Sequence, residues 1–378
     1  MKLSSLIADL KLRIRFHRGE KATREFIKTH ACPPLSKDDK RQIDEYWAQF
    51  GIRLRSYSSH QMYYAVTGVH DPRFIPKAVS ALALVPHYND LALTSAYSDK
   101  NRFTNIMPDM PFPKALGCRI NRRYLDRDGV YYGEVLTDEY VRTIYQTLRH
   151  EKIDYIIIKV AIGSCAGKGV RKFMIDSEDA LRAALTDFDA ANFIIQDVVK
   201  QHPVFAQLNE SSVNIIRCTS WRNGDEVHIF SPCIRFGIPG SATDVSYKDG
   251  VEIVNCVAIA PDGRIHDHAV SLDGSKTPLA LTDWYVPQWE QIVAKIRSEH
   301  RKMHHFGIIA WDITVNDQNE IVCIEFNLKR PGSIVYQFAH GPMAGEHSDA
   351  YLACLKDPRV RRTLLPSSYL IRGFKAKK

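Results

Sequence analysis

Residues 306–332, FGIIAWDITVNDQNEIVCIEFNLKRPG, decide the fold that we expect for this chain. Residues 308–315 surround Asp312 with apolar side chains, and residues 320–326 are rich in Ile, Val and Cys, so both segments predict β-strands. Between them, NDQN at residues 316–319 favours a tight turn, because Asn and Asp tolerate unusual backbone angles. We therefore expect a β-hairpin with a polar turn.

The hairpin carries polar side chains that could form a metal site. If Val315 lies opposite Glu320, Asp312 faces Cys323, and Glu325 is its diagonal neighbour. Since strand side chains alternate between faces, Glu325 and Asn327 then share a face with Asp312, and a one-residue slip would separate them. Two carboxylates and an amide oxygen suit Mg²⁺ carrying nucleotide phosphates. The alternative is that these are ordinary polar residues at strand ends.

Composition is that of a globular protein large enough for two or three domains. The 378 residues are 45% hydrophobic and 25% charged, with a net charge of +8. This charge is consistent with anionic ligands or an anionic surface, and we expect no nucleic-acid partner. Because the eight cysteines show no metal spacing, and no signal peptide or membrane-spanning run is visible, we expect reduced thiols and a cytoplasmic location.

Residues up to about 111 predict a mainly helical domain that ends at the proline-rich segment 107–113. Residues 2–28 predict one basic amphipathic helix, in which Leu3, Ile7, Leu10 and Ile14 recur at helical spacing among Lys and Arg. Such a helix can lie on an anionic membrane as a peripheral anchor, or it can pack on its own domain. Both possibilities stay open at this point.

A second candidate site centres on a lysine inside an apolar strand. Residues 155–161, YIIIKVA, predict a buried strand in which Lys159 is costly unless it is paired or bound to an anion. GSCAGKGV follows at 163–170, and it matches neither a P-loop nor a dinucleotide fingerprint. Its backbone amides and Lys168 could fold over phosphates, although three glycines can also form a simple turn.

Further polar residues occur at strand ends and inside apolar strands. In FIIQDVV, at 193–199, Gln196 and Asp197 could face an adenine edge and ribose hydroxyls. Arg217 and Arg235 sit in apolar strands, where arginine usually binds an anion. They could hold a substrate carboxylate or a transferring phosphoryl group, or they could form salt bridges to acids elsewhere in the chain.

Four segments together resemble the ATP-grasp superfamily, and most closely its sugar-transfer-associated branch. They are SDKNRF around Lys100, KVAIGSCAGKGV, FIIQDVVKQHPVFAQLNESSVNIIRCTSW and the hairpin, in matching order over residues 99–332. The resemblance implies an α+β fold in which two α+β lobes clamp ATP. We accordingly expect a mainly helical N-terminal domain (1–111), an N-lobe with a glycine-rich lid loop (112–200), a C-lobe with the metal site (201–356) and a basic C-terminal tail (357–378).

The resemblance also implies roles for individual residues. Phosphates would be bound by Lys100 and Lys159, with the lid loop closing over them. Arg235 matches the arginine that family members place near the acyl-phosphate. The full set that we expect is Lys100, Lys159, Ser164, Gly167, Lys168, Gly169, Gln196, Asp197 and Val199 for ATP; Asp312, Glu325 and Asn327 for Mg²⁺; and Arg235, Arg217, Asn214 and Lys168 for catalysis.

This sequence departs from the family pattern in two places. Cys165 and Ala166 stand in the lid loop where glycine or serine is usual. SATD at 241–244 replaces the usual Asp-Asn turn near the substrate, so substrate identity stays open.

The resemblance implies an ATP-dependent carboxylate–amine or carboxylate–thiol ligase that works through an acyl-phosphate, with ATP and Mg²⁺ as cofactors. The substrates would be a carboxylate and an amine or amino acid, one of them part of a polysaccharide or its sugar precursor. Two alternatives are a phosphotransferase that acts on a sugar-type acceptor and a nucleotide-regulated, non-catalytic scaffold in glycan assembly.

Overall fold

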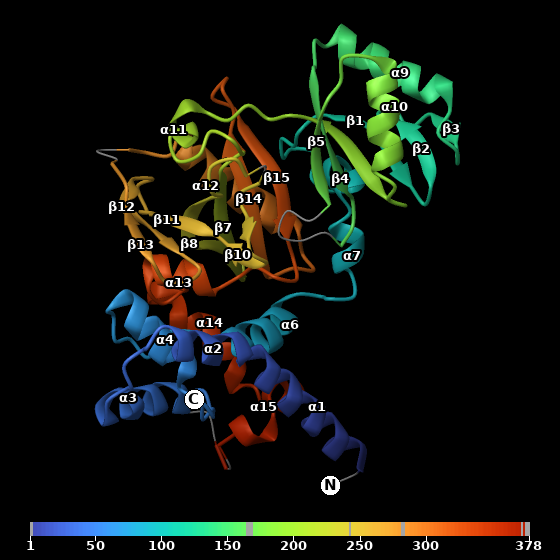
Figure 1. The fold of residues 1–378 in the computed structure, drawn as a ribbon. Coiled ribbons are helices and arrows are strands. Elements are labelled where there is room, and N and C mark those ends of the chain that lie inside the picture. The colour runs from blue at the N-terminus through green and yellow to red at the C-terminus, as the bar shows by residue number, and fades with distance from the viewer. Residues whose placement is uncertain (1–2, 164–168, 242, 281–283, 372, 375–378) are drawn as a thin grey trace.

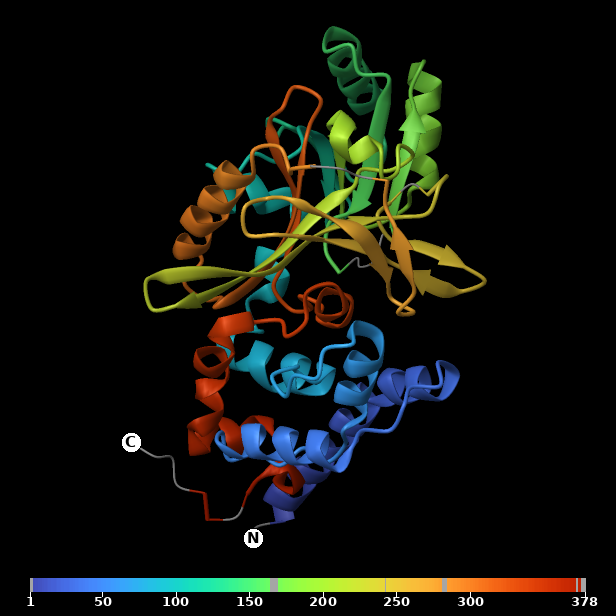
Figure 2. The same ribbon diagram turned by 90° about the vertical axis from the view of Figure 1, so that its left-hand side faces the viewer.

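The computed structural model describes residues 3–163, 169–241, 243–280, 284–371 and 373–374, which form a helical domain and two large β-sheets (Figure 1). The helical domain lies at one end of the molecule, and both sheets lie beyond it (Figure 2). Its N-terminal elements are α1 (Leu3–Gly19), α2 (Lys21–Thr29), α3 (Lys37–Ala48), α4 (Ser58–Thr67), α5 (Lys77–Val79), the π-type turn η1 (Ser80–Leu84) and α6 (Val85–Tyr88).

Residues from the C-terminal end complete the helical domain. They form η3 (Gly345–His347), α14 (Ser348–Leu352), η4 (Ala353–Lys356), α15 (Pro358–Leu364) and η5 (Ser367–Tyr369). Leu352 and Leu365 share one apolar core with Trp47, Tyr63 and Phe74. The tail that we expected from residue 357 is therefore wrong for the described residues up to 371, because their apolar side chains are buried in this core.

The expected helix over residues 2–28 is two helices, which meet between Gly19 and Lys21. Glu20, at the junction, is buried and accepts hydrogen bonds from the hydroxyls of Ser58 and Ser59. Helix α3 begins at a reciprocal capping box formed by Ser36 and Asp39.

The segment from residue 94 to 112 belongs to the sheets more than to the helical domain. It forms three short helical elements, α7 (Thr94–Tyr97), η2 (Lys100–Arg102) and α8 (Phe103–Ile106). Phe103, Met107 and Met110 pack into the same core as Trp311 and Phe326 of the hairpin. Because of this packing, Lys100 lies next to the hairpin.

The first sheet has six strands in the order β3-β2-β1-β6-β4-β5, and α9 and α10 pack against it (Figure 1). Thr137 caps α9 by accepting a hydrogen bond from the Tyr140 amide. The elements are β1 (Ala115–Ile120), β2 (Arg123–Asp126), β3 (Tyr131–Gly133), α9 (Asp138–His150), β4 (Tyr155–Val160), β5 (Val170–Met174), α10 (Glu178–Asp187) and β6 (Phe193–Asp197).

The second sheet has seven strands in the order β13-β12-β11-β8-β7-β14-β15. The strands are β7 (Ile215–Asn223), β8 (Glu226–Phe236), β11 (Asn255–Ile259), β12 (Ile265–Ser271), β13 (Lys276–Pro278), β14 (Ile308–Val315) and β15 (Ile321–Asn327). Beside them lie α11 (Pro203–Ala206), α12 (Trp289–Lys302), α13 (Ile334–His340) and a two-stranded ribbon of β9 (Ser246–Lys248) and β10 (Val251–Ile253).

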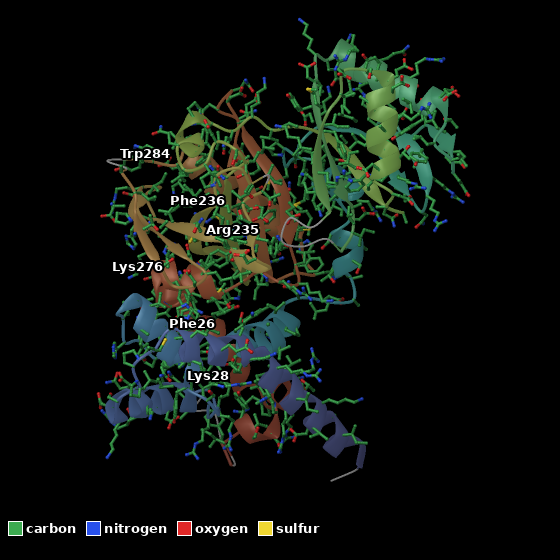
Figure 3. The ribbon with its side chains drawn as sticks, in the orientation of Figure 1. Phe26, Lys28, Arg235, Phe236, Lys276 and Trp284 are labelled. Atoms are coloured by element: carbon green, nitrogen blue, oxygen red, sulfur yellow. The ribbon has the colours of Figure 1, made fainter. Side chains whose placement is uncertain are left out.

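The two faces of this sheet have different partners because side chains alternate along each strand. One face packs under α12 through residues such as Ile216, Ile234 and Trp311. The opposite face packs Trp221 and Phe230 against the helical domain. Phe26 of α2 lies at this junction, 5.8 Å from Phe338 of α13 between ring centroids (Figure 3).

The predicted hairpin and its turn are confirmed, but the predicted register is wrong. Val315 pairs with Ile321, and a β-bulge between Asp312 and Ile313 brings Asp312 directly opposite Glu325. Without the bulge, the observed Val315 pairing would place Asp312 opposite Ile324 and would turn Glu325 to the other face. Because of the bulge, Asp312 and Glu325 share a face, as we predicted, although the predicted register was different.

Candidate functional site

A cavity of about 860 Å³ lies between the two sheets. Its walls come from β4 and β5, from the segment after β6, from β7, β8 and β15, and from residues 329–336 after the hairpin. The helical domain adds Lys77, Ser80 and Ala81. Because the polar residues of β7, β8 and β14 share the face of Trp221 and Phe230, the cavity continues the surface on which the helical domain packs.

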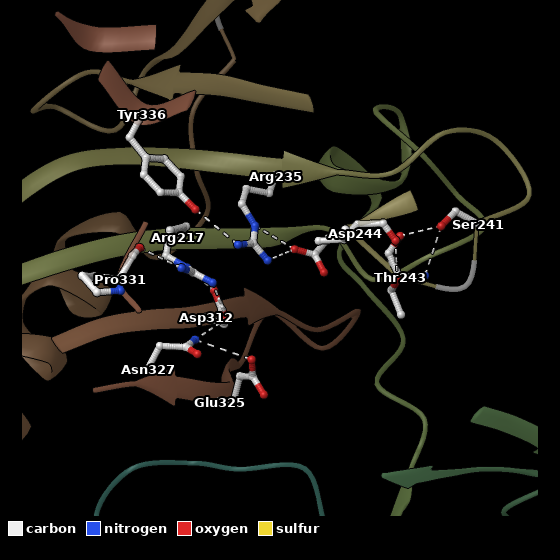
Figure 4. A network of polar contacts seen from close by, with 11 residues as sticks. Arg217, Arg235, Ser241, Thr243, Asp244, Asp312, Glu325, Asn327, Pro331 and Tyr336 are labelled. Carbon is white, nitrogen blue, oxygen red and sulfur yellow. Dashed lines mark hydrogen bonds and ion pairs between the residues drawn. The ribbon is translucent and has the colours of Figure 1, made fainter. Parts of the chain in front are cut away.

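The three predicted metal ligands converge at the hairpin. Asn327 Nδ2 donates to Asp312 Oδ2 at 3.1 Å and to Glu325 Oε1 at 3.5 Å (Figure 4). Lys100 Nζ lies 3.3 Å from Glu325 Oε2. Burial alone would raise the pKa of Glu325, but Lys100 and Lys159 bring it below its usual value, so this carboxylate is anionic at neutral pH.

Lys159 is buried on β4, with only 8% of its surface exposed. Burial lowers its pKa to about 8, with Lys100 adding to the decrease and Glu325 opposing it. Lys100 therefore disfavours the charged form of Lys159, and Glu325 stabilises it. This arrangement gives the buried lysine of the apolar strand the electrostatic partner that its sequence context demands.

Arg217 holds Asp312 in a bidentate ion pair. Its Nε and Nη2 lie 2.5 Å and 2.8 Å from the two carboxylate oxygens, and its Nη1 donates to the Pro331 carbonyl at 3.1 Å (Figure 4). Burial raises the pKa of Asp312, and Arg217 opposes this increase. Both partners are almost fully buried, so losing either one would leave an uncompensated charge.

Arg235 is paired in the same way with an acid that sequence reasoning did not single out as its partner. Its Nε donates to Asp244 Oδ2 at 2.7 Å, its Nη2 also contacts that carboxylate, and its Nη1 donates to the Tyr336 hydroxyl at 3.2 Å (Figure 4). Arg235 lies on β8, where Figure 3 labels it, and lines the cavity. The alternative left open by the sequence, salt bridges to other acids, therefore describes both arginines in this structure.

Tyr336 connects the two arginines, and no sequence pattern marks it. Its ring lies 5.9 Å from the Arg217 guanidinium, and its hydroxyl accepts from Arg235. Gly332 makes room for this ring, since it has a φ of +80° and an added Cβ would lie 2.7 Å from Tyr336 Cε2. Lys329 and Arg330, just before, are exposed cavity residues without an ion-pair partner in the described part of the chain.

The predicted nucleotide residues divide into two groups. Asp197 and Val199 line the cavity, and burial raises the pKa of Asp197. Asp197 Oδ1 is buried and has no hydrogen-bond partner among the described residues. Gln196 does not line the cavity, because its side-chain amide donates to the Pro113 carbonyl at 3.2 Å.

Asn214, predicted to be catalytic, also lies behind the cavity wall. Its Nδ2 donates to the carbonyls of Phe205 and Asn209 at 2.5 Å and 2.9 Å, and its side chain is fully buried. These bonds tie the α11 segment to the start of β7. The placement favours a positioning role over contact with a substrate.

Most of the predicted lid loop lies outside the described residues, including Ser164, Gly167 and Lys168. Gly169 is described, and its carbonyl accepts a hydrogen bond from the Val160 amide at 2.8 Å. The β4–β5 hairpin that carries the loop is confirmed. Among the described residues, no group of three or more His, Cys, Asp or Glu side chains is arranged to hold a metal ion. The predicted set, with two acids and an amide, is of a different composition.

Comparison with known protein families identifies the family of this chain. The profile of the sugar-transfer associated ATP-grasp family matches residues 80–348, which is more than half of the chain. The chain belongs to this family. The matched region begins within the helical domain and includes both sheets of the ATP-grasp fold, the whole hairpin and both arginines.

No curated protein sequence matches the chain. Solved structures that match part of this chain include an ADP complex of the N5-carboxyaminoimidazole ribonucleotide synthetase PurK, with 13% identity over 63% of this chain and 47% of that one, and a TM-score of 0.36. D-alanine-D-alanine ligase from Coxiella burnetii has 12% identity over 71% and 58%, with a TM-score of 0.38. The ATP-grasp ligase PsnB, complexed with a minimal precursor, has 14% identity over 70% and 63%, with a TM-score of 0.37.

This chain thus spans less than two thirds of the length of each of these three proteins. At such low similarity, their reactions cannot be transferred to it. Within the described residues, no helix combines the length and the apolar character needed to cross a membrane.

Proposed function

We propose that this protein is an ATP-dependent ligase that joins a carboxylate to an amine through an acyl-phosphate. The observation that carries the proposal is the charge arrangement in one cavity. Anionic Glu325 lies beside half-buried Lys100 and buried Lys159, and the same sheet face carries two arginines that are each held by an acid. Membership of the ATP-grasp family supports the assignment of nucleotide to this cavity.

The lysine end of the cavity suits the nucleotide. Lys100 and Lys159 would bind its phosphates, because Lys100 Nζ lies 3.3 Å from Glu325 and Lys159 is a buried cation on the cavity wall under the influence of the same carboxylate. Asp197, whose buried Oδ1 has no partner in the described part of the chain, would accept a hydrogen bond from a ribose hydroxyl. Val199 would lie beside the base. We keep Gln196 as a backbone contact only, since its side chain bonds elsewhere.

The residues present fit Mg²⁺. Asp312, Glu325 and Asn327 offer hard oxygen donors within one hydrogen-bonded cluster that lines the cavity. When bound, Mg²⁺ would neutralise charge on the nucleotide phosphates. Arg217 would keep the Asp312 carboxylate ionised and oriented while Lys100 does the same for Glu325.

The arginine end suits the acceptor. A substrate carboxylate entering the cavity would compete with Asp244 for the Arg235 guanidinium, which is held in place by Tyr336. A carboxylate oxygen would attack the γ-phosphorus, and the bond to the ADP oxygen would break. The amine would then add to the acyl carbon, phosphate would leave, and the nitrogen would lose a proton. The protein supplies positioning and positive charge for these steps.

The substrate class follows from the family and the cavity wall. The family is associated with sugar transfer, so we propose that one substrate is a polysaccharide or its sugar precursor. Lys77, Lys329 and Arg330 are exposed lining residues, and their positive charge favours an acidic sugar, such as a uronic acid.

The test is ADP formation from Mg-ATP with a panel of uronic acids, sugar nucleotides and amino acids. Hydroxylamine is added in parallel, because it converts an acyl-phosphate into a stable hydroxamate. Glu325→Gln should abolish ADP formation. Glu320→Gln is the matched control, since Glu320 lies on the same hairpin, is exposed, and bonds to Asn316 at the turn.

ADP that requires an acid, together with hydroxamate formation, supports the ligase. If ADP formation requires a sugar acceptor but no hydroxamate forms, the protein is a phosphotransferase and the ligase proposal is wrong. Nucleotide binding with no turnover on the full panel would favour the scaffold. Equal activity of Glu325→Gln and wild type would refute the site itself.

A further inference from the structure

Helix α1 carries an apolar stripe that faces away from the protein. Ile7, Leu10 and Ile14 are 47%, 57% and 44% exposed. Because each residue turns a helix by about 100°, these three side chains fall within an arc of about 60°. Phe16 lies nearly opposite this arc and is buried, with its ring 5.1 Å from that of Tyr369 between centroids.

Helix α1 contacts the helical domain through the side opposite the stripe. The stripe itself therefore does not serve to attach α1 to the domain. Asp9 accepts hydrogen bonds from the Ser367 backbone amide and from Arg13, at 2.5 Å and 2.8 Å. Gly19 lies against Ala78 of α5. α1 projects from the helical domain at the end of the molecule away from both sheets (Figures 1 and 2).

Basic side chains border the stripe. At about 100° per residue, Lys11, Arg15 and Arg18 fall along one edge of the arc. All three are exposed, and within the described ranges none of them forms an ion pair. In the described side chains of α1 the single acid is Asp9, which is already bonded on the body side. The stripe therefore combines apolar area with uncompensated positive charge.

We propose that α1 docks this protein on an anionic lipid surface, with Ile7, Leu10 and Ile14 inserted and the three cations on the headgroups. An exposed apolar face flanked by Lys and Arg has the composition of a helix lying in the membrane interface. A second copy of the chain is the less suitable occupant. Pairing two stripes would bring six cations together without an acid to compensate them. The proposal is independent of the reaction in the cavity.

The experiment measures co-sedimentation of the full chain with vesicles of phosphatidylcholine alone or mixed with phosphatidylglycerol. We expect binding to the mixed vesicles only, and loss of binding in concentrated salt, because salt screens the headgroup charge. The variant Ile7→Ser/Leu10→Ser/Ile14→Ser should lower partitioning by more than about tenfold. Lys11→Gln/Arg15→Gln/Arg18→Gln should lower it by about fivefold for each charge removed.

Two matched controls separate the stripe from surface properties in general. Val69→Ser/Val130→Ser/Val135→Ser removes three apolar side chains that are 45%, 52% and 76% exposed on other elements. Lys248→Gln/Arg264→Gln/Lys276→Gln removes three exposed cations from the seven-stranded sheet and its ribbon. Both controls should bind vesicles like wild type. Because all the substituted side chains are exposed, the melting temperature should not change, and this is checked for each variant.

Several outcomes would overturn the proposal. These are equal binding to both kinds of vesicle, no binding to the mixed vesicles, or full binding by the stripe variant. Light scattering provides a further test of the occupant. A wild-type dimer that becomes a monomer in the stripe variant, with no vesicle binding by either, would assign the stripe to self-association instead.

Discussion

Raising the pH from 7 to 9 should weaken nucleotide binding about tenfold through Lys159. Burial lowers the pKa of this lysine to about 8 in the free protein. A bound phosphate would raise that pKa, because it favours the charged ammonium, so the protonated form is the one that binds. Affinity is therefore fully present below pH 8 and is lost as the pH rises above it.

The magnitude follows from the protonated fraction of Lys159 before binding. With a pKa of about 8, this fraction is roughly 0.9 at pH 7 and roughly 0.09 at pH 9. The ratio corresponds to about 1.4 kcal/mol of binding free energy. Calorimetric titration with ADP at pH 7, 8 and 9, in two buffers of different ionisation enthalpy, would measure both the affinity and the protons taken up.

The variant Lys159→Met should bind ADP more weakly at pH 7 and should lose the dependence on pH. Lys172→Met is the control, because Lys172 also lines the cavity but is exposed and lies over the Tyr155 ring, at 4.7 Å from its centroid. It should retain the wild-type slope. A wild-type affinity that stays constant from pH 7 to 9, or a slope that survives in Lys159→Met, would refute the reasoning.

Three further predictions concern stability. His300 is buried with a pKa of about 4, so its neutral form is required, and acidification from pH 7 to 5.5 should lower its own contribution to the unfolding free energy by about 1 kcal/mol in urea titrations; His300→Gln should reduce the pH dependence of stability by this amount, while His60 and His340, whose pKa values burial also lowers to about 4, keep their contributions. Asn214→Ala should cost about 1–3 kcal/mol, because two buried carbonyls lose their donor, and an unchanged urea midpoint would contradict the positioning role. Gly263→Ala should lower the melting temperature more than Gly250→Ala, since both have positive φ but only at Gly263 would the added Cβ lie 2.7 Å from the Trp289 ring; equal effects would disprove the steric contribution.

Much of the local structure could be predicted because its causes lie within a few residues. The polar turn of the hairpin, the caps at Ser36 and Thr137, and the buried strand around Lys159 all follow from short-range rules. For Arg217 and Arg235 the sequence left two alternatives open, and the structure shows the salt bridges to acids elsewhere in the chain. These acids are Asp312 and Asp244.

Asp312, Glu325 and Asn327, the proposed metal ligands, share one face as predicted, although the predicted register is wrong. We aligned the hairpin by assuming a regular ladder, and the structure has a shifted pairing with a β-bulge at Asp312. No residue pattern within the hairpin predicts the β-bulge. It depends on how β14 packs between β7 and β15, and this packing is a property of the whole sheet.

The sequence by itself determined the residue types of the site and the strands and turns that carry them, because propensity and side-chain alternation act locally. Only the tertiary structure decided which charges meet. In the folded chain, Lys100 pairs with Glu325 and Arg235 pairs with Asp244. Tyr336 lies between the two arginines, and α15 packs against the N-terminal helices. These contacts join residues that are far apart along the chain, and their energies come from burial and charge pairing that exist only once the sheets and helices have packed.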